Sequence, residues 1–286
     1  MARIIAVANQ KGGVGKTTTC VNLVAALADM NYRVLLVDLD PQGNASTGLG
    51  VNARELERTA MDVMAGECTV AEATVTLEAL GFDLLPSNAD LGAAERLLLG
   101  QEGREFRLRE ALEDVAPRYG WIIIDCPPSL NVLTLNALAA ANSVLVPIQC
   151  EYYALEGLAG LLQTIEEVRA SVNPGLEIEG LLRTMYDIRN KLSNAVSDEL
   201  TTNFGDRVYR TLVPRNVRVA EAPSYGLPVL RYDPGSRGAL AYIGLAGEIL
   251  RRRRRREAGD IDPGSFETGP EPPVVDAQTL SNDPED

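Results

Sequence analysis

The 286-residue sequence contains no histidine. This absence excludes Ser-His-Asp and Cys-His nucleophilic catalysis, and it excludes zinc sites with imidazole ligands. Cysteine is scarce as well, and the four residues, at positions 20, 68, 126 and 150, have no CxxC spacing. We therefore expect no disulfide framework and interpret the cysteines as ordinary buried thiols.

Long apolar runs are also missing. No stretch approaches the roughly 20 apolar residues of a membrane-spanning helix, and the run Ile4–Ala8 is too short for a signal peptide. Hydrophobic residues make up 45% of the chain and the mean hydropathy is −0.04, as in globular proteins. A cytoplasmic protein is the expectation.

Positively charged residues are also few, since the chain has 27 Lys and Arg against 40 Asp and Glu, which gives a net charge of −13. Taken as an average, this argues against a nucleic-acid partner, since phosphate binding requires Lys and Arg. Only three of the bases are lysines, and Lys11 and Lys16 fall within six residues. Because almost all other basic residues are arginines, two lysines so close together indicate a site that favours compact ammonium groups.

Short, almost wholly apolar runs alternate with helical patterns along the chain. Such runs are typical of parallel strands covered on both faces, and the alternation predicts a doubly wound α/β sheet, mostly parallel, with helices on both faces. The strands are expected at 3–8, 33–38, 82–86, 120–125, 143–148, 178–185 and 208–213. The helices are expected at about 16–30, 90–116, 131–141, 155–172, 191–204 and 237–250.

A glycine-rich loop follows the first strand and opens the first helix, which is the context of a phosphate-binding P-loop. Its glycines allow successive N–H groups to face a phosphate, and the helix dipole points the same way. Lys16 should reach the β- and γ-phosphates of ATP, Thr17 should bind Mg²⁺, and Thr18 should lie toward the α-phosphate. The expected nucleotide-binding residues are Lys11, Gly12, Gly13, Val14, Gly15, Lys16, Thr17 and Thr18.

Carboxylates follow two further strands. Asp38 and Asp40 stand two residues apart and so face the same way, whereas Asp125 ends an apolar strand in a Walker B pattern. A carboxylate at the position of Asp125 suits a Mg²⁺-bound water. Asp38 either supports the metal region or caps a helix or turn.

The segment KGGVGKTT at 11–18 resembles the deviant Walker A motif of the ParA/MinD/NifH class of ATPases. The resemblance implies that Lys11 reaches across a nucleotide-sandwich dimer to the partner's phosphates, like an arginine finger. It also implies that Asp40 positions the hydrolytic water. With Lys16, these residues are the expected catalytic set.

Three longer blocks, at 149–157, 214–223 and 232–238, are similar to the chromosomal ParA/Soj branch, and the resemblance covers about 2–250. It implies that Pro214 and Asn216 bracket adenine. It further implies an ATP-bound homodimer that binds double-stranded DNA without sequence preference and is nucleoid-associated. A ParB-type centromere-binding protein would stimulate slow ATP hydrolysis and release the DNA.

The charge distribution supports a DNA partner independently. Residues 183–218 hold seven bases and four acids, whereas the rest of 1–250 has a net charge of −13. A local basic zone on an acidic body is what phosphate contact requires. The expected DNA-binding residues are Arg183, Arg189, Lys191, Arg210 and Arg218. Of these, the family resemblance implies that Arg189 and Arg218 lie on the DNA-facing surface of the dimer.

The C-terminal part departs from the family core. We expect an ATPase domain at 1–250, an arginine run at 251–256 and a disordered acidic tail at 257–286, which holds nine acids and no bases. The run either adds nonspecific DNA affinity or pairs with the tail, and the tail could then compete with DNA for the same arginines.

Other functions share the same ATPase core. A MinD-like membrane ATPase would need an amphipathic C-terminal helix, but anionic lipid would repel the acidic tail, so no membrane partner is expected. An iron-protein-like role requires paired cysteine ligands, and Cys126 lacks a second cysteine on the loop that the class uses. The sequence fits equally a ParA-like ATPase that positions a protein cargo in place of a chromosome.

Overall fold

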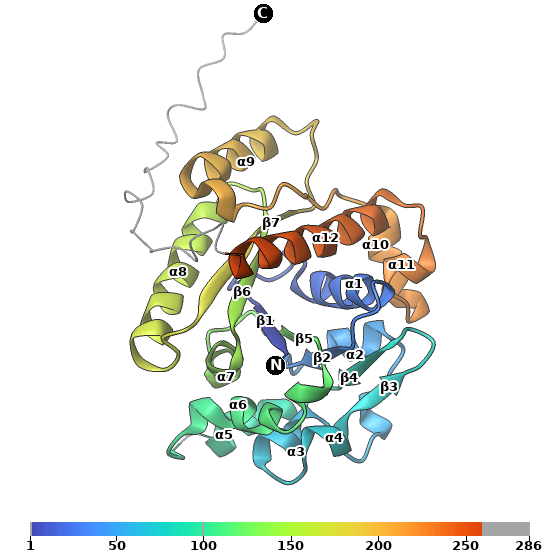
Figure 1. The fold of residues 1–286 in the computed structure, drawn as a ribbon, viewed down its shortest axis with the longest axis vertical. Helices are drawn as coiled ribbons and strands as arrows, with labels where there is room; N and C mark the ends of the chain where they lie inside the picture. Colours follow the sequence, from blue (N-terminus) through green and yellow to red (C-terminus); the bar gives the residue numbers. More distant parts are fainter. Residues whose placement is uncertain (1, 99, 259–286) are drawn as a thin grey trace, which may run out of the picture.

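The computed structural model describes residues 2–98 and 100–258. Within them, one sheet has the strand order β3-β4-β2-β5-β1-β6-β7 (Figure 1). All neighbouring strands are parallel except β3, which is antiparallel to β4. The strands are β1 (Arg3–Val7), β2 (Val34–Asp38), β3 (Val75–Leu77), β4 (Phe82–Leu85), β5 (Trp121–Asp125), β6 (Ser143–Gln149) and β7 (Glu177–Thr184).

Helices cover both faces of this sheet (Figure 1). The α-helices are α1 (Lys16–Asp29), α2 (Asn44–Gly48), α3 (Ala60–Ala65), α4 (Val70–Ala73), α5 (Leu91–Leu98), α6 (Arg107–Glu113), α7 (Val132–Ala140), α8 (Ala154–Ser171), α9 (Lys191–Phe204), α10 (Val217–Glu221), α11 (Val229–Tyr232) and α12 (Arg237–Glu257). Short 3-10 helices are η1 (Ala53–Glu55), η2 (Arg104–Phe106), η3 (Ala116–Arg118), η4 (Gly205–Arg207) and η5 (Ala222–Tyr225).

Two hydrophobic clusters lie on the two faces of the sheet. One packs α3 and α5 to α9 against it, and the other packs α1, α2, α11 and α12. The central strands β2 and β5 are buried at every position, because both of their faces are covered. The expected doubly wound α/β fold is confirmed.

Six of the expected strands lie within one residue of their expected bounds, but the seventh, at 208–213, is wrong. This segment has one isolated bridge to β7, between Val208 and Leu181, and donates to β7 from the backbone N–H groups of Tyr209 and Val213 without forming a continuous ladder. The carboxylate of Glu248 accepts hydrogen bonds from the backbone N–H groups of Arg210 at 3.0 Å and Thr211 at 2.9 Å. Because these two N–H groups donate to the Glu248 side chain, they are not available to a neighbouring strand. A continuous strand therefore does not form at 208–213.

Two of the expected helices differ from the structure, and α2, α3, α4, α10 and α11 have no counterpart among the expected helices. The long helix expected at 90–116 is divided into α5, η2 and α6, and Gly100 and Gly103 in between have φ angles of 92° and 67°, which no α-helix contains. Helix α12 does not end at residue 250 but continues through the arginine run to Glu257, since arginine is a good helix former. The tail expected at 257–286 lies outside the described residues from 259 onward.

Candidate nucleotide-binding site

The sheet brings the chemically informative segments to one edge. Val7 and Asp38 are both paired in register with Asp125, so β1, β2 and β5 end at the same level. The P-loop follows β1 there, and both carboxylates stand on neighbouring strands. Ligands of open α/β sheets bind at this carboxyl edge.

The P-loop has the conformation of an anion cradle. Gly13 and Gly15 have φ angles of 76° and 89°, a left-handed region that strongly favours glycine. Helix α1 begins directly after Gly15 and no side chain caps its first turn, so its first N–H groups remain for an anion. The hydroxyl of Thr184 at the end of β7 donates to the carbonyl of Val14 at 2.7 Å and holds the loop.

Lys16 is buried in this cradle, with 7% of its surface exposed. Its ammonium donates to the carbonyl of Lys11 at 3.3 Å and forms no ion pair among the described residues. Burial lowers the pKa of Lys16, while Asp125 and Asp40 oppose that shift. A buried ammonium without a paired carboxylate suits a polyanionic ligand such as a phosphate chain.

Lys11 points to a different partner. Its ammonium lies 2.7 Å from a carboxylate oxygen of Glu151, and both side chains are partly exposed. The backbone N–H of Lys11 donates to Asn9 at 2.9 Å, and Asn9 in turn donates to the carbonyl of Pro147. The two lysines of one loop therefore have different environments: Lys16 is enclosed and Lys11 is at the surface.

Asp125 is fully buried at the end of β5. Burial and the charge of Asp38 raise its pKa to about 8, although Thr17 opposes the shift. The thiol of Cys20 donates to Oδ1 at 3.6 Å, whereas Oδ2 has no hydrogen-bond partner among the described residues. An unpaired buried carboxylate oxygen beside the Thr17 hydroxyl is a donor set that Mg²⁺ with its water shell fits.

Asp38 is fully buried, but its oxygens are engaged. Oδ2 accepts hydrogen bonds from the N–H of Ser46 at 2.9 Å and from its hydroxyl at 2.7 Å, and Oδ1 accepts from the N–H of Asp40. Burial raises the pKa of Asp38 to about 6. These contacts fasten the start of α2 and favour the structural alternative, a turn and helix cap.

Asp40 lies beyond the end of β2 with 7% exposure, and its Oδ1 accepts from the N–H of Gln42 at 3.0 Å. The turn that follows requires Gly43, which has φ +60° and where a Cβ would lie 2.5 Å from the carbonyl oxygen of Ser87. Ser87 also donates to the backbone carbonyl of Asp40 at 2.8 Å. The carboxylate of Asp40 is thus held on a tight, supported turn beside the P-loop edge.

Pro214 and Asn216 lie in the loop that precedes α10. Pro214 bridges to Tyr186 just beyond β7, so this loop is anchored near the strand whose Thr184 contacts the P-loop. The Asn216 side chain caps α10 by accepting from the N–H groups of Arg218 and Val219. These contacts describe a structural role for Asn216, and the adenine contact stays a prediction.

The five expected DNA-binding residues have unequal environments. The Arg189 side chain is 86% exposed beside Asp187, and that of Arg218 is 53% exposed beside Glu221 and Asp233. Lys191 and Arg210 are exposed. Arg183 differs, because its guanidinium donates to the Ser197 hydroxyl and to the carbonyl of Tyr209, both at 2.8 Å, which braces the segment after η4.

Comparisons with known proteins agree with this geometry. The family model described as "AAA domain" matches residues 2–178. The chain is 54% identical over 259 residues to the chromosome partitioning protein ParA of Caulobacter vibrioides, which covers 90% of this chain and 97% of that protein. The chain belongs to the ParA/Soj family of chromosome-partitioning ATPases.

Two further matches support the assignment of this chain to the ParA/Soj family. It is 51% identical over 249 residues to the sporulation initiation inhibitor protein Soj of Bacillus subtilis, covering 87% of this chain and 98% of that protein. Among solved structures, cobyrinic acid a,c-diamide synthase from Mycobacterium smegmatis with bound ADP and magnesium is 40% identical, with a TM-score of 0.79 and coverage of 91% and 97%. The resemblance inferred from the motifs is therefore confirmed.

Some contacts at the site had no sequence signal. Glu151 lies in one of the family-like blocks, but nothing in its spacing indicates an ion pair with Lys11, 140 positions away. Ser46 and Thr184 are likewise ordinary residues in the sequence and become part of the site only through the fold. In the described residues, no helix has the length and apolarity to cross a membrane.

Proposed function

We propose that this chain is an ATP-dependent DNA-partitioning ATPase that works as a homodimer with ATP sandwiched between subunits. The observation that carries the proposal is the different environment of the two P-loop lysines. Lys16 is buried in the cradle, whereas Lys11 is at the surface and can extend to a second subunit. A loop that served one subunit alone would have no need of an exposed second ammonium.

The residues of the carboxyl edge divide the work of hydrolysis. Lys16, the loop N–H groups of Gly12 to Gly15 and the hydroxyls of Thr17 and Thr18 bind the phosphates of ATP. Asp125 and Thr17 would hold hydrated Mg²⁺, which would neutralise charge on the phosphate oxygens. Asp40 orients the attacking water, and Lys11 of the other subunit stabilises the charge that develops on the transferred phosphoryl group.

DNA binding is assigned to the exposed bases Arg189, Lys191, Arg210 and Arg218. Their positive charges lie at the surface. The aromatic residues of the basic segment 183–218, which are Tyr186, Phe204 and Tyr209, are half-buried or buried and so do not form an exposed platform for bases. Contact is therefore with phosphates, without sequence preference, at the nucleoid. Arg183, which is held by internal hydrogen bonds, we assign to the structure.

A ParB-type centromere-binding protein is the proposed partner, as the family membership suggests, and it would accelerate a slow hydrolysis that releases the DNA. The printed name of the Caulobacter relative, a chromosome partitioning protein, supports this direction.

A gel-shift series tests the proposal. Nonspecific duplex DNA is mixed with the full chain plus ATP, ADP or no nucleotide, each at two salt concentrations. We expect a shift that depends on ATP and that weakens steeply with salt. Equal retardation in all three nucleotide states would contradict the control of DNA binding by ATP. No retardation in any state would contradict DNA as the partner.

A further inference from the structure

The six arginines of the run 251–256 in α12 fall into two sets on opposite sides of the helix. Arg252, Arg253 and Arg256 are half-buried and face the protein. Arg251, Arg254 and Arg255 are exposed. Spacings of three and four residues place each set on one face, so the run is not a uniform basic tail.

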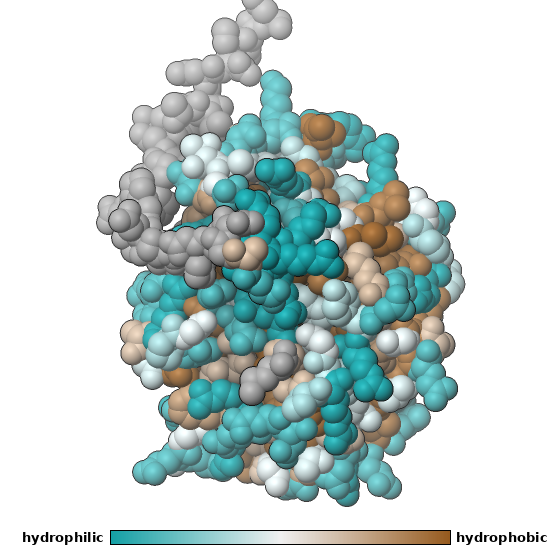
Figure 2. All heavy atoms as spheres, in the orientation of Figure 1, coloured by the Kyte–Doolittle hydropathy of each residue, from teal (hydrophilic) through white to brown (hydrophobic). Residues whose placement is uncertain are grey.

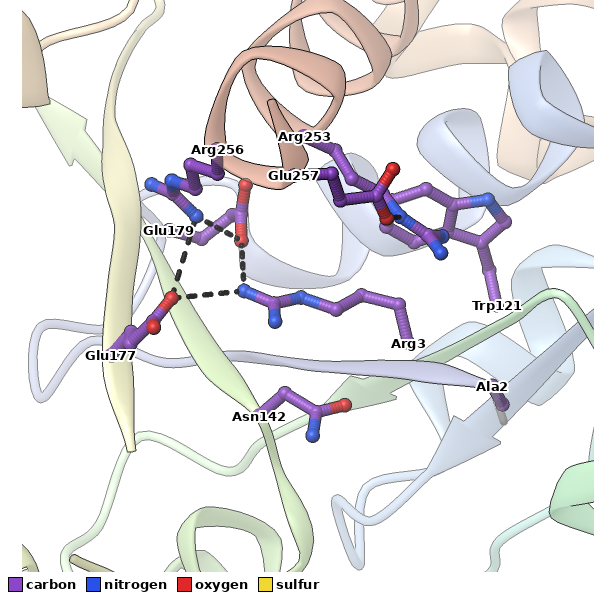
Figure 3. A pocket seen from close by; sticks show the side chains of 9 residues that line it. All are labelled: Ala2, Arg3, Trp121, Asn142, Glu177, Glu179, Arg253, Arg256 and Glu257. Atoms are coloured by element: carbon purple, nitrogen blue, oxygen red, sulfur yellow. Dashed lines mark hydrogen bonds and ion pairs between the residues drawn. The ribbon is translucent and has the colours of Figure 1, made fainter. Parts of the chain in front are cut away.

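Arg253 and Arg256 of the inward set fasten the end of α12 to the amino edge of the sheet (Figure 3). Arg256 lies 3.3 Å from buried Glu179, and Arg3 lies 3.2 Å from the same carboxylate. The hydroxyl of Ser143 donates to Glu179 at 2.7 Å. The guanidinium of Arg253 stands 5.2 Å from the centre of the Trp121 ring, a cation–π distance.

The outward set continues onto Arg210. Arg210, Arg251 and Arg255 line one surface hollow together with two acids, Asp206 and Glu248. Glu248 is already bonded to Arg252 and to two backbone N–H groups. Arg210, Arg251, Arg254 and Arg255 form no ion pair among the described residues. We call these four residues the outer arginine surface. Figure 2 shows strongly hydrophilic atoms over the C-terminal part of α12.

This surface stands apart from the nucleotide site. Arg256 lies 3.6 Å from Glu177, which begins β7, and shares that carboxylate with Arg3, which begins β1. The P-loop follows the other end of β1, and Asp125 is the last residue of β5. ATP at the carboxyl edge therefore has no direct contact with the outer arginine surface. Left uncovered, such a surface would hold DNA phosphates in every nucleotide state.

We propose that the outer arginine surface binds residues 259–286 of the same chain, and that this contact suppresses DNA binding in the absence of ATP. The segment holds eight acids and no bases and is joined to α12 directly. Covalent attachment supplies an effective concentration of about 1 mM, which an external polyanion must exceed. The suppression rests on the proposed DNA function, but the tail contact does not.

The tail contact is measured without DNA by energy transfer from Trp121, the single tryptophan, to a dye on the tail. The dye is placed at Ser281→Cys in a full-length Cys68→Ala background, since the other three cysteines are buried. We expect efficient transfer at low salt. It should fall about twofold or more at high salt and in the variant Arg251→Gln/Arg254→Gln/Arg255→Gln.

The matched control is Arg54→Gln/Arg96→Gln/Arg118→Gln, which removes three exposed arginines on other elements and should keep the transfer. Equal transfer in the parent and the α12 variant would overturn the proposal. Circular dichroism of both variants shows whether either has lost its fold.

The second arm uses a full-length chain whose eight tail acids are changed to Asn or Gln. Its affinity for DNA without nucleotide should rise about three- to tenfold, and the α12 variant should cancel the rise. An unchanged affinity would overturn the suppression. Should no variant bind DNA in any state while transfer still depends on the arginines, the proposed function fails and the tail contact stands.

Discussion

Lys11 and Glu151 form an ion pair of 2.7 Å that holds the surface lysine of the P-loop against its own subunit. Glu151 is held in turn by a hydrogen bond from Gln149. If Lys11 serves the phosphates of a second subunit, this pair must open when the dimer forms. The pair therefore opposes dimerisation by its own modest free energy.

Changing Glu151→Gln should strengthen the ATP-dependent dimer. A partly exposed ion pair contributes a fraction of a kcal/mol, so we expect a gain of about two- to fivefold in dimer affinity. Analytical ultracentrifugation with an ATP analogue measures it. Glu113→Gln on α6 is the control, and a weaker dimer for Glu151→Gln would show that the glutamate assists the sandwich.

Removing the buried ammonium with Lys16→Ala should weaken ATP binding by about 100-fold, because charge-assisted hydrogen bonds to phosphate are lost from an enclosed site. Titration with a fluorescent ATP analogue measures the affinity. Lys191→Ala, which removes the remaining lysine outside the P-loop, should bind the analogue normally. Full binding by Lys16→Ala would refute the assigned phosphate contact.

Asp40→Ala should bind ATP and DNA but hydrolyse ATP about 100-fold more slowly, since the group that orients the water is missing. Phosphate release in single-turnover conditions gives the rate, and the gel shift with ATP shows that binding persists. Normal turnover by this variant would remove Asp40 from the catalytic set.

The pair Arg189→Ala/Arg218→Ala should retain ATP-dependent dimerisation and lose DNA. Both side chains are exposed, so the change leaves the core intact, and the salt slope of binding should fall by about one per lost phosphate contact. The double change Arg54→Ala/Arg96→Ala controls for net charge. Retention of full DNA affinity would contradict the chosen surface.

Glu179→Gln should lower the free energy of unfolding by about 2 kcal/mol, because it removes one partner of a buried charge cluster. Burial alone would raise the pKa of Glu179, but Arg256, Arg3 and Ser143 outweigh it and lower the pKa below 4.5. The stabilisation is therefore present at neutral pH and is lost as pH falls below that value. Urea unfolding at pH 7 and pH 4 measures both effects, and the more exposed Glu177→Gln should cost less.

The sequence alone identified the parts of this protein that depend on local order. The apolar runs before Asp38 and Asp125 mark buried parallel strands because both faces of such strands are covered. The glycines at 13 and 15 mark the cradle because few other residues adopt its left-handed φ angles. Family, fold and phosphate loop follow from these short patterns.

Only the tertiary structure decided the partners that lie far apart in the chain. It paired Lys11 with Glu151, directed Oδ2 of Asp38 to Ser46, and placed Glu248 where it prevents a strand at 208–213. It also divided the arginine run into an inward and an outward set. Such choices depend on which side chains the folded sheet brings within hydrogen-bond distance, and no local pattern records that.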